Sequence, residues 1–175
     1  MYDVVFMTPN MQGTIKGEVI GTLQIATILK EKGMSCRLIP FCEIGDLNFF
    51  EAFLDRAVAL VEEAQPKILS FYTRSDIYHI ALRIAERVKE KWPEIYVVMG
   101  GPQSDITAKE SLERLPYIDF VCCGEGEATA YPLFASLLQS SPDYSVEGLV
   151  YRKDGKVTAN PRPGLIEDLD SIPFI

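Results

Sequence analysis

The sequence predicts an α/β fold: a flavodoxin-like (Rossmann-like) doubly wound parallel sheet of about five strands. Short apolar runs alternate with amphipathic helical patterns along most of the chain, which is typical of parallel βαβ units. The run Tyr96–Met99 is apolar without alternation, as expected of a strand that is buried on both faces. We expect the strand order 2-1-3-4-5, with a ligand crevice at the carboxyl ends of the first and third strands.

Each element follows from its local pattern. Strands are expected at Val4–Met7, Arg37–Phe41, Ile68–Tyr72, Tyr96–Met99 and Phe120–Cys123. Helices are expected at Glu18–Lys32, Phe49–Ala64, Ile77–Lys91, Ala108–Leu115 and Ala128–Leu138. Gly33 suits the residue that follows the end of the first helix. In the third helix Asp76 is placed to cap the start, and Pro93 should end it.

The pattern changes after about residue 140. Glu147–Arg152 and Val157–Ala159 predict two short strands, and the pair Asp154 and Gly155 between them is a strong hairpin signal. Residues 161–175 are rich in proline and indicate an extended linker. We therefore expect an α/β domain at 1–140, an appended β-hairpin at 141–160 and a linker at 161–175.

The composition argues against several functional classes. Of the 175 residues, 47% are hydrophobic and 24% are charged, which is ordinary for a globular domain. The net charge is −8 and no Lys/Arg cluster occurs, so neither a nucleic-acid nor a membrane partner is expected. No apolar run has the length of a membrane-spanning helix and no signal peptide is evident, so we expect a cytoplasmic protein.

The cysteines and the single histidine form no metal-binding motif. Cys36, Cys42, Cys122 and Cys123 lack CxxC spacing, so buried or half-buried thiols in a reducing cytosol are expected. His79 falls early in the third predicted helix, where a packed or surface histidine is a better explanation than a metal ligand. No metal site and no catalytic residue are predicted.

The strongest functional signal lies between residues 95 and 127. Gly100, Gly101 and Pro102 follow one buried strand, and the segment Gly124–Glu127 follows the next. Open α/β sheets bind ligands at these strand ends, and glycine lets a bulky ligand approach the backbone. We therefore expect a large, flat or extended ligand over this edge. Each segment also has a plainer explanation, since Gly-Pro punctuates βα loops and acids complement a helix dipole.

The first loop and the missing motifs narrow the choice of ligand. Thr8–Gly17 is long and polar, and its place at the switch point favours a ligand role over a simple connection. No GxGxxG opens the first helix and no GxxxxGK[ST] occurs, so dinucleotide and P-loop sites are excluded. The acidic residues of a phosphoacceptor receiver are missing, and one histidine makes a Ser/His/Asp set improbable.

Taken together, several segments resemble one family. These are ILSFYT, WPEIYVVMGGP, YIDFVCCGEGEAT, VEGLVYRKDGKV, NPRP and IEDLDSIPF. In this order they are similar to the cobalamin-binding domains at the N-terminus of B12-type radical SAM enzymes, over nearly the whole chain. The resemblance implies cobalamin as cofactor and, as partner, a downstream radical SAM barrel of the same polypeptide. The chain would then be an excised or truncated part of its parent.

The resemblance also implies where the cofactors bind. Residues implied to contact cobalamin are Asn10, Gln12, Gly13, Ser70, Tyr72, Thr73, Gly100, Gly101, Pro102, Gln103, Gly124, Glu125, Gly126 and Glu127. A [4Fe-4S] cluster and S-adenosylmethionine would bind outside this chain, which alone should have no turnover. The DxHxxG loop that supplies a cobalt-ligating histidine in other B12 enzymes is absent, which implies base-off cobalamin without a protein His ligand.

The predicted function is thus a cobalamin-binding module of a B12-dependent radical SAM enzyme, whose parent is a methyltransferase or another radical enzyme. Two alternatives stay open. One is a vestigial domain that binds no cofactor and supports the barrel or a partner. The other is a flavin-binding flavodoxin-like domain, which is disfavoured because the first loop lacks a Ser/Thr-rich phosphate cradle.

Overall fold

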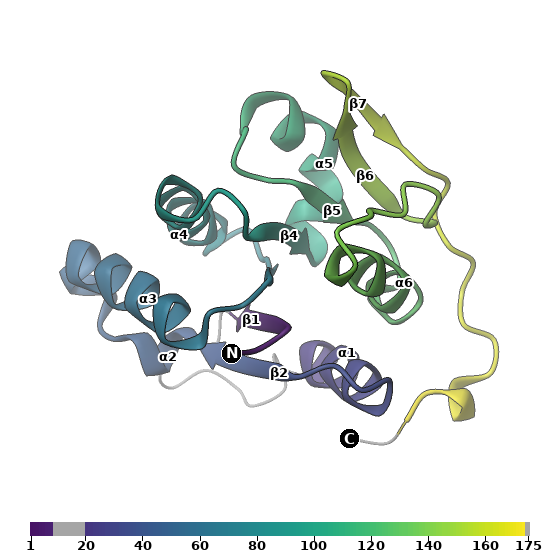
Figure 1. Cartoon of the computed structure of the whole chain (residues 1–175), viewed down its shortest axis with the longest axis horizontal. Coiled ribbons are helices and arrows are strands. Elements are labelled where there is room, and N and C mark those ends of the chain that lie inside the picture. Colours follow the sequence, from purple (N-terminus) through teal and green to yellow (C-terminus); the bar gives the residue numbers. More distant parts are fainter. Residues whose placement is uncertain (9–19, 174–175) are drawn as a thin grey trace.

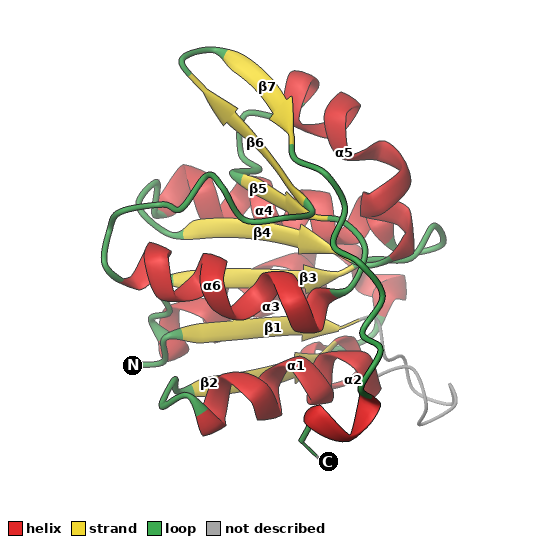
Figure 2. Ribbon diagram, turned by 90° about the vertical axis from the view of Figure 1, so that its right-hand side faces the viewer, coloured by secondary structure: helices red, strands yellow, loops and turns green. Residues whose placement is uncertain are grey.

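The computed structural model describes residues 1–8 and 20–173, and one sheet in the order β2-β1-β3-β4-β5-β6-β7 runs through it (Figure 1). Its parallel strands are β1 (Val4–Thr8), β2 (Cys36–Pro40), β3 (Ile68–Tyr72), β4 (Tyr96–Gly100) and β5 (Phe120–Cys122). The predicted fold class and the order 2-1-3-4-5 are therefore confirmed. All five parallel strands deliver their carboxyl ends to one edge (Figure 2).

The C-terminal hairpin belongs to the same sheet. β6 (Leu149–Lys153) pairs antiparallel with β5, and β7 (Lys156–Ala159) pairs antiparallel with β6. The sheet thus has seven strands, and the expectation of about five was too small because the hairpin continues the sheet. Asp154 and Gly155 have φ values of 51° and 74°, as a tight hairpin turn with two left-handed residues requires.

Helices cover both faces of the sheet (Figures 1 and 2). One face carries α1 (Ile20–Glu31) and α6 (Gly126–Leu138), and the other carries α3 (Phe50–Ala64), α4 (Tyr78–Lys91) and α5 (Pro102–Arg114). Short helical turns complete the list: α2 (Phe41–Ile44), η2 (Leu47–Phe49) and η3 (Leu169–Ser171). Successive residues of β1 feed opposite cores, since Phe6 packs under α1 and α6 whereas Met7 packs on the other face.

Some local expectations need correction. α5 begins at Pro102 rather than at Ala108, because proline suits the first turn of a helix. Phe41 was assigned to a strand but starts the short helix α2. Asp76 does not cap α4, whose N-cap residue is Ile77 without a side-chain bond; Asp76 pairs instead with Arg74. Gly33 has φ 86° after α1, as predicted.

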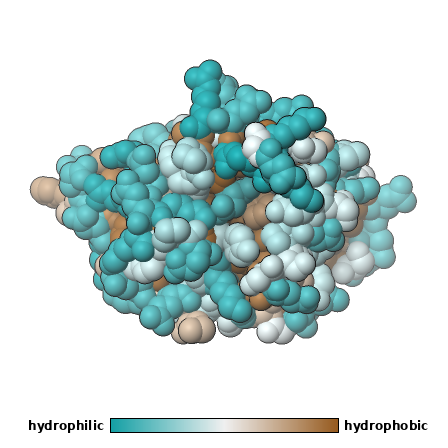
Figure 3. Space-filling model, turned by 45° about the horizontal axis from the view of Figure 1, so that its top comes forward, coloured by the Kyte–Doolittle hydropathy of each residue, from teal (hydrophilic) through white to brown (hydrophobic). Residues whose placement is uncertain are grey.

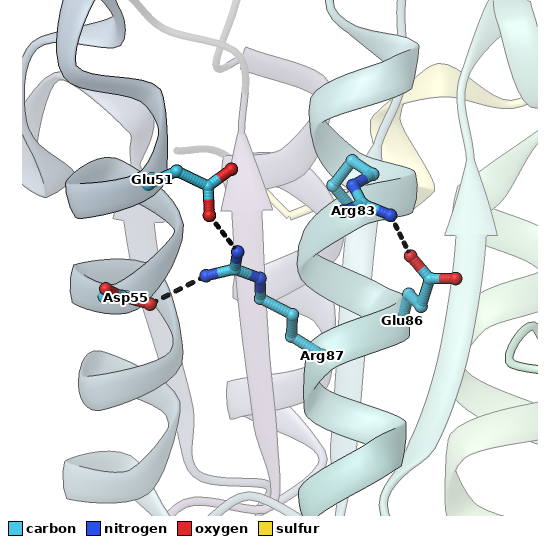
Figure 4. Close-up of polar contacts among 5 residues, drawn as sticks. All are labelled: Glu51, Asp55, Arg83, Glu86 and Arg87. Atoms are coloured by element: carbon cyan, nitrogen blue, oxygen red, sulfur yellow. Dashed lines mark hydrogen bonds and ion pairs between the residues drawn. The ribbon is translucent and has the colours of Figure 1, made fainter.

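Surface ion pairs contribute little to the stability of the packing between α3 and α4. Arg87 of α4 donates to Asp55 of α3 at 2.7 Å and also contacts Glu51 (Figure 4). Both carboxylates are largely exposed, and exposed ion pairs contribute about 0–1 kcal/mol. Buried side chains of the two helices, such as Phe53 of α3 and Ile84 of α4, supply the larger apolar term.

One face of the molecule is mainly polar. Figure 3 shows one face on which hydrophilic side chains predominate and apolar patches are small. Within the described ranges, no helix combines the length and the apolar character that crossing a membrane would need.

A partly buried ion pair lies at the amino edge of the sheet. Lys89 Nζ is 2.7 Å from Asp119 Oδ2, and the two side chains are 15% and 24% exposed. The same carboxylate accepts a hydrogen bond from the backbone N–H of Val97 at 2.7 Å. Burial raises the pKa of Asp119, while the Lys89 ammonium opposes this shift. The pair therefore holds the ends of α4, β4 and β5 together.

We expect Lys89→Met to lower the free energy of unfolding by about 2–3 kcal/mol at neutral pH, because Asp119 is left mostly buried without its counter-charge. Its folded-state pKa then lies further above the unfolded value, so protonation favours the folded state and the loss should shrink as the pH falls. Urea denaturation at neutral and mildly acid pH measures both effects. Arg56→Met, which removes an exposed pair with Glu63, is the control and should change little. A loss that is equal at both pH values would contradict the prediction.

Candidate functional site

The carboxyl ends of β3, β4 and β5 open into a cavity of about 460 Å³. The sheet forms its floor. Phe6, Ser70 and Val98 are paired neighbours across β1, β3 and β4. Tyr72 and Gly100 form the next pair on the same face, two residues further along β3 and β4 toward the carboxyl edge. Because alternate residues of a strand share one face, both rows point toward α1 and α6. The volume lies within the range of about 300–1,000 Å³ that is usual for ligand sites.

Two helices form the side walls of the cavity. Thr22 and Ile25 project from α1, and Ala130 and Phe134 project from α6. The ring centroids of Phe134 and Phe6 are 6.2 Å apart. The inner part of the cavity is therefore an apolar slot between the sheet and two helices, with few polar side chains on its lining.

The mouth of the cavity carries the charged groups. Asp105, Glu125, Glu127 and Arg162 line it, and Arg162 pairs with Asp105 at 2.8 Å. α6 begins at Gly126, so the positive end of its dipole lies at this mouth. Acidic side chains beside a helix N-terminus are stabilised by that dipole, as the sequence suggested.

The two glycines after β4 have different roles. Gly101 has φ 94°, and a Cβ there would lie 2.8 Å from both the backbone N and O of Thr73. At Gly100 a Cβ would come no closer to the protein than 3.9 Å, at the carbonyl oxygen of Phe71. Gly101 is thus required by the fold itself, in addition to any ligand contact that the resemblance implies for it. Gly100 leaves free space on the cavity floor.

Thr73 fixes the loops around the cavity without lining it. Its backbone N–H donates to the carbonyl oxygen of Gly100 at 2.8 Å, and its hydroxyl lies 2.5 Å from the hydroxyl of Ser104 in α5. Gln103, also implied as a cofactor contact, donates its backbone N–H to the Thr73 carbonyl at 3.3 Å and is not among the lining residues. Both residues serve as scaffold in this structure.

The other sequence-derived site residues divide into two groups. Those that line the cavity are Ser70, Tyr72, Gly100, Gly101, Pro102, Gly124, Glu125, Gly126 and Glu127. Asn10, Gln12 and Gly13 lie outside the described residues. The structure therefore brings the third-strand, fourth-strand and fifth-strand segments together at one site, and it leaves the first-loop residues as a prediction.

Sequence reasoning missed part of the cavity floor, the helical walls and one distant residue. Phe6, Thr22, Ile25 and Phe134 carry the periodicity of ordinary core residues, which hides a lining role. Arg162 lies far along the chain, in a segment without regular structure. The NPRP motif was the one available signal for it.

The titratable groups at the site favour binding over chemistry. Burial raises the pKa of Cys122 and of Cys123 to about 12, so both thiols are neutral at physiological pH and react poorly. His79 is on α4, on the opposite face of the sheet, where its ring lies 6.5 Å from the Phe50 ring. No group of three or more His, Cys, Asp or Glu suited to a metal ion occurs among residues 1–8 and 20–173.

Comparisons with known proteins agree with this geometry. Residues 14–133 match the family described as the B12 binding domain. The chain is 26% identical to an uncharacterized methyltransferase of Pyrococcus horikoshii over 98% of the chain and 37% of that protein. It is 30% identical to the cobalamin-dependent radical SAM methyltransferase TokK of Streptomyces tokunonensis, over 56% of the chain and 14% of that protein.

Solved structures share the fold. The radical S-adenosylmethionine methyltransferase TsrM of Kitasatospora setae, with cobalamin and a [4Fe-4S] cluster bound, matches 97% of this chain and 30% of its own with a TM-score of 0.71 and 15% identity. The cobalamin-dependent radical enzyme OxsB with aqua-cobalamin bound gives a TM-score of 0.73 and 18% identity, over 94% of this chain and 23% of its own. The chain therefore spans well under half of the proteins it resembles.

The contact of Gly101 with Thr73 gives a prediction about stability. We expect Gly101→Ala to lower the free energy of unfolding by about 1–3 kcal/mol, because the new Cβ meets backbone atoms in a left-handed conformation. Gly100→Ala is the matched control and should unfold close to the unmodified protein. Chemical denaturation of both variants measures the difference. Equal stability of the two variants would show that the turn is not constrained as described.

Proposed function

The chain belongs to the family of B12-binding domains, and on this premise we propose that it is the cobalamin-binding module of a B12-dependent radical SAM enzyme. In the parent, a downstream radical SAM barrel of the same polypeptide would hold the [4Fe-4S] cluster and S-adenosylmethionine. Relatives that are radical SAM methyltransferases support this assignment, and they favour methyl transfer as the parent reaction. When bound, cobalamin supplies a cobalt centre that can carry a methyl group.

The observation that carries the proposal is the shape of the cavity. The cavity of about 460 Å³ narrows to an apolar slot between the sheet, α1 and α6, and we place the corrin ring with its amide arms outside this slot. It can lie across the strand ends, where Gly100 leaves the floor free of a side chain. The flat benzimidazole of the nucleotide arm suits the apolar inner slot, and the Ser70 hydroxyl can hydrogen-bond to it there. The residues present thus fit this cofactor.

We further propose that cobalamin is held base-off, without a protein imidazole on cobalt. The benzimidazole cannot occupy the inner slot and coordinate the cobalt above it at the same time. His79 is the only histidine of the chain and faces α3 rather than the cavity. The neutral thiol of Cys122 is also a poor ligand for the metal.

Two further points remain proposals. We place the protein in the cytoplasm, which suits four free cysteines. We also keep the division into a cobalamin-binding domain at 1–140, a hairpin at 141–160 and a linker at 161–175, with the hairpin paired to the domain's sheet.

Cobalamin binding tests the proposal directly. We expect the chain to bind hydroxocobalamin in a one-to-one complex, and Gly100→Val to weaken binding by about tenfold or more, because two methyl groups then fill the cavity floor. Gly164→Val is the control, since that glycine has open space around it and does not line the cavity. Absorbance titration measures the affinities. Failure of the unmodified protein to bind would favour the vestigial, cofactor-free alternative.

The spectrum of bound cob(II)alamin tests the axial ligand. We expect an electron paramagnetic resonance signal without hyperfine splitting from an axial nitrogen, and the same signal in His79→Ala. Splitting that is present in the unmodified protein and lost in His79→Ala would refute the proposal. Splitting that persists in the variant would show that the benzimidazole stays on cobalt.

A further inference from the structure

The segment that follows β7 is fixed against the edge of the sheet at which the cavity opens. The carbonyl oxygen of Pro161 accepts a hydrogen bond from the Gly148 N–H at 2.7 Å, and the Asn160 side chain donates to the carbonyl oxygens of Tyr144 and Val146 at 2.8 and 2.7 Å. Pro163 lies so close to Gly124 that a Cβ on that glycine would come within 3.3 Å of its ring. Figure 2 shows the segment passing the carboxyl ends of the strands.

This docking brings Arg162 into the wall of the cavity. Its Nη1 donates to Asp105 Oδ2 at 2.9 Å, and its Nη2 lies 2.8 Å from Asp105 Oδ1. Asp105 is in the first turn of α5, directly after the glycine turn that borders the cavity. The carboxylate thus holds the guanidinium through one hydrogen bond and a close ion-pair contact, and a guanidinium has more N–H donors than this pair uses. The Arg162 side chain is still 62% exposed, so a ligand can reach it.

The charges at the mouth make Arg162 distinctive. It is the one basic side chain on the described lining, whereas Asp105, Glu125 and Glu127 are acidic. In cobalamin the amide arms are neutral, and the phosphodiester between the corrin and the benzimidazole is the anionic group. With the corrin over the strand ends and the base in the slot, this phosphodiester must pass the mouth. An anion among carboxylates needs a positive partner there.

We propose that Arg162 is a cofactor-binding residue that recognises the phosphodiester of the nucleotide arm, with Asp105 as the residue that positions it. The N-terminus of α6, which lines the same mouth, adds N–H groups and a favourable dipole for the anion. This inference rests on the proposed function and goes beyond it, because it assigns part of the cofactor site to the segment that leads out of the domain.

The test compares two ligands that differ in the nucleotide arm. Hydroxocobalamin carries the phosphodiester, whereas cobinamide keeps the corrin and its amide arms but lacks the nucleotide and its phosphate. We expect Arg162→Gln to weaken hydroxocobalamin binding by about tenfold and to change cobinamide binding by less than about twofold. Arg162→Lys should keep part of the affinity, because lysine keeps the positive charge but lacks the planar guanidinium and its paired N–H donors. Absorbance titration of the whole 175-residue chain gives the dissociation constants.

The controls separate this claim from the proposed function and from folding. Arg114→Gln alters another exposed arginine of the α5 region, paired with Glu110, and should leave both affinities unchanged. Circular dichroism and urea denaturation check that the Arg162 variants fold.

Equal losses of affinity for both ligands would overturn the phosphodiester assignment, and unchanged affinities would remove Arg162 from the site. If the unmodified chain binds hydroxocobalamin no tighter than it binds cobinamide, the nucleotide contact is absent. If it binds neither ligand, the proposed function itself fails, and this inference with it.

Discussion

The close approach of Gly101 to the backbone of Thr73 is the constraint on which the site depends. It lets β3 and β4 end side by side, with the Thr73 N–H bonded to the Gly100 carbonyl. It also lets α5 begin at the next residue, Pro102, and turn away from the edge. The space above the strand ends stays open as a result. A fold of this class always has such an edge, but here the packing of one glycine decides how much of it a ligand can use.

The sequence predicted the framework of this protein well, because its strands are buried on both faces and its helices are amphipathic. Runs such as Ile68–Tyr72 can be recognised without tertiary information. The cavity walls could not be recognised in this way. Phe134 packs against the core and lines the slot at once, so the same hydrophobic periodicity describes both roles. Arg162 reaches the site through tertiary docking, and although the NPRP motif marks the segment, it does not indicate what Arg162 contacts.

Among the described residues, the side chains that line the cavity are suited to binding a ligand. The thiol nearest the cavity, Cys122, is kept neutral by burial, and the single imidazole of the chain is on the far face of the sheet. The chain provides a cavity with an apolar inner slot and a few polar groups in fixed positions at its mouth. Such a site can keep a reactive metal cofactor in one orientation without competing with it for protons or electrons.

The pairing of β6 and β7 with β5 has a consequence for the solubility of the domain. β5 is a short buried strand, and without the hairpin its backbone N–H and C=O groups would form an open edge that another chain could pair with. The hairpin moves the edge to β7, a short strand that begins with Lys156, and a charged, short edge resists intermolecular pairing. A fragment that stopped at residue 140 would expose the β5 edge and be prone to strand-mediated aggregation. The hairpin therefore protects the edge of β5 from pairing with another chain, in addition to any role that it has at the cofactor site.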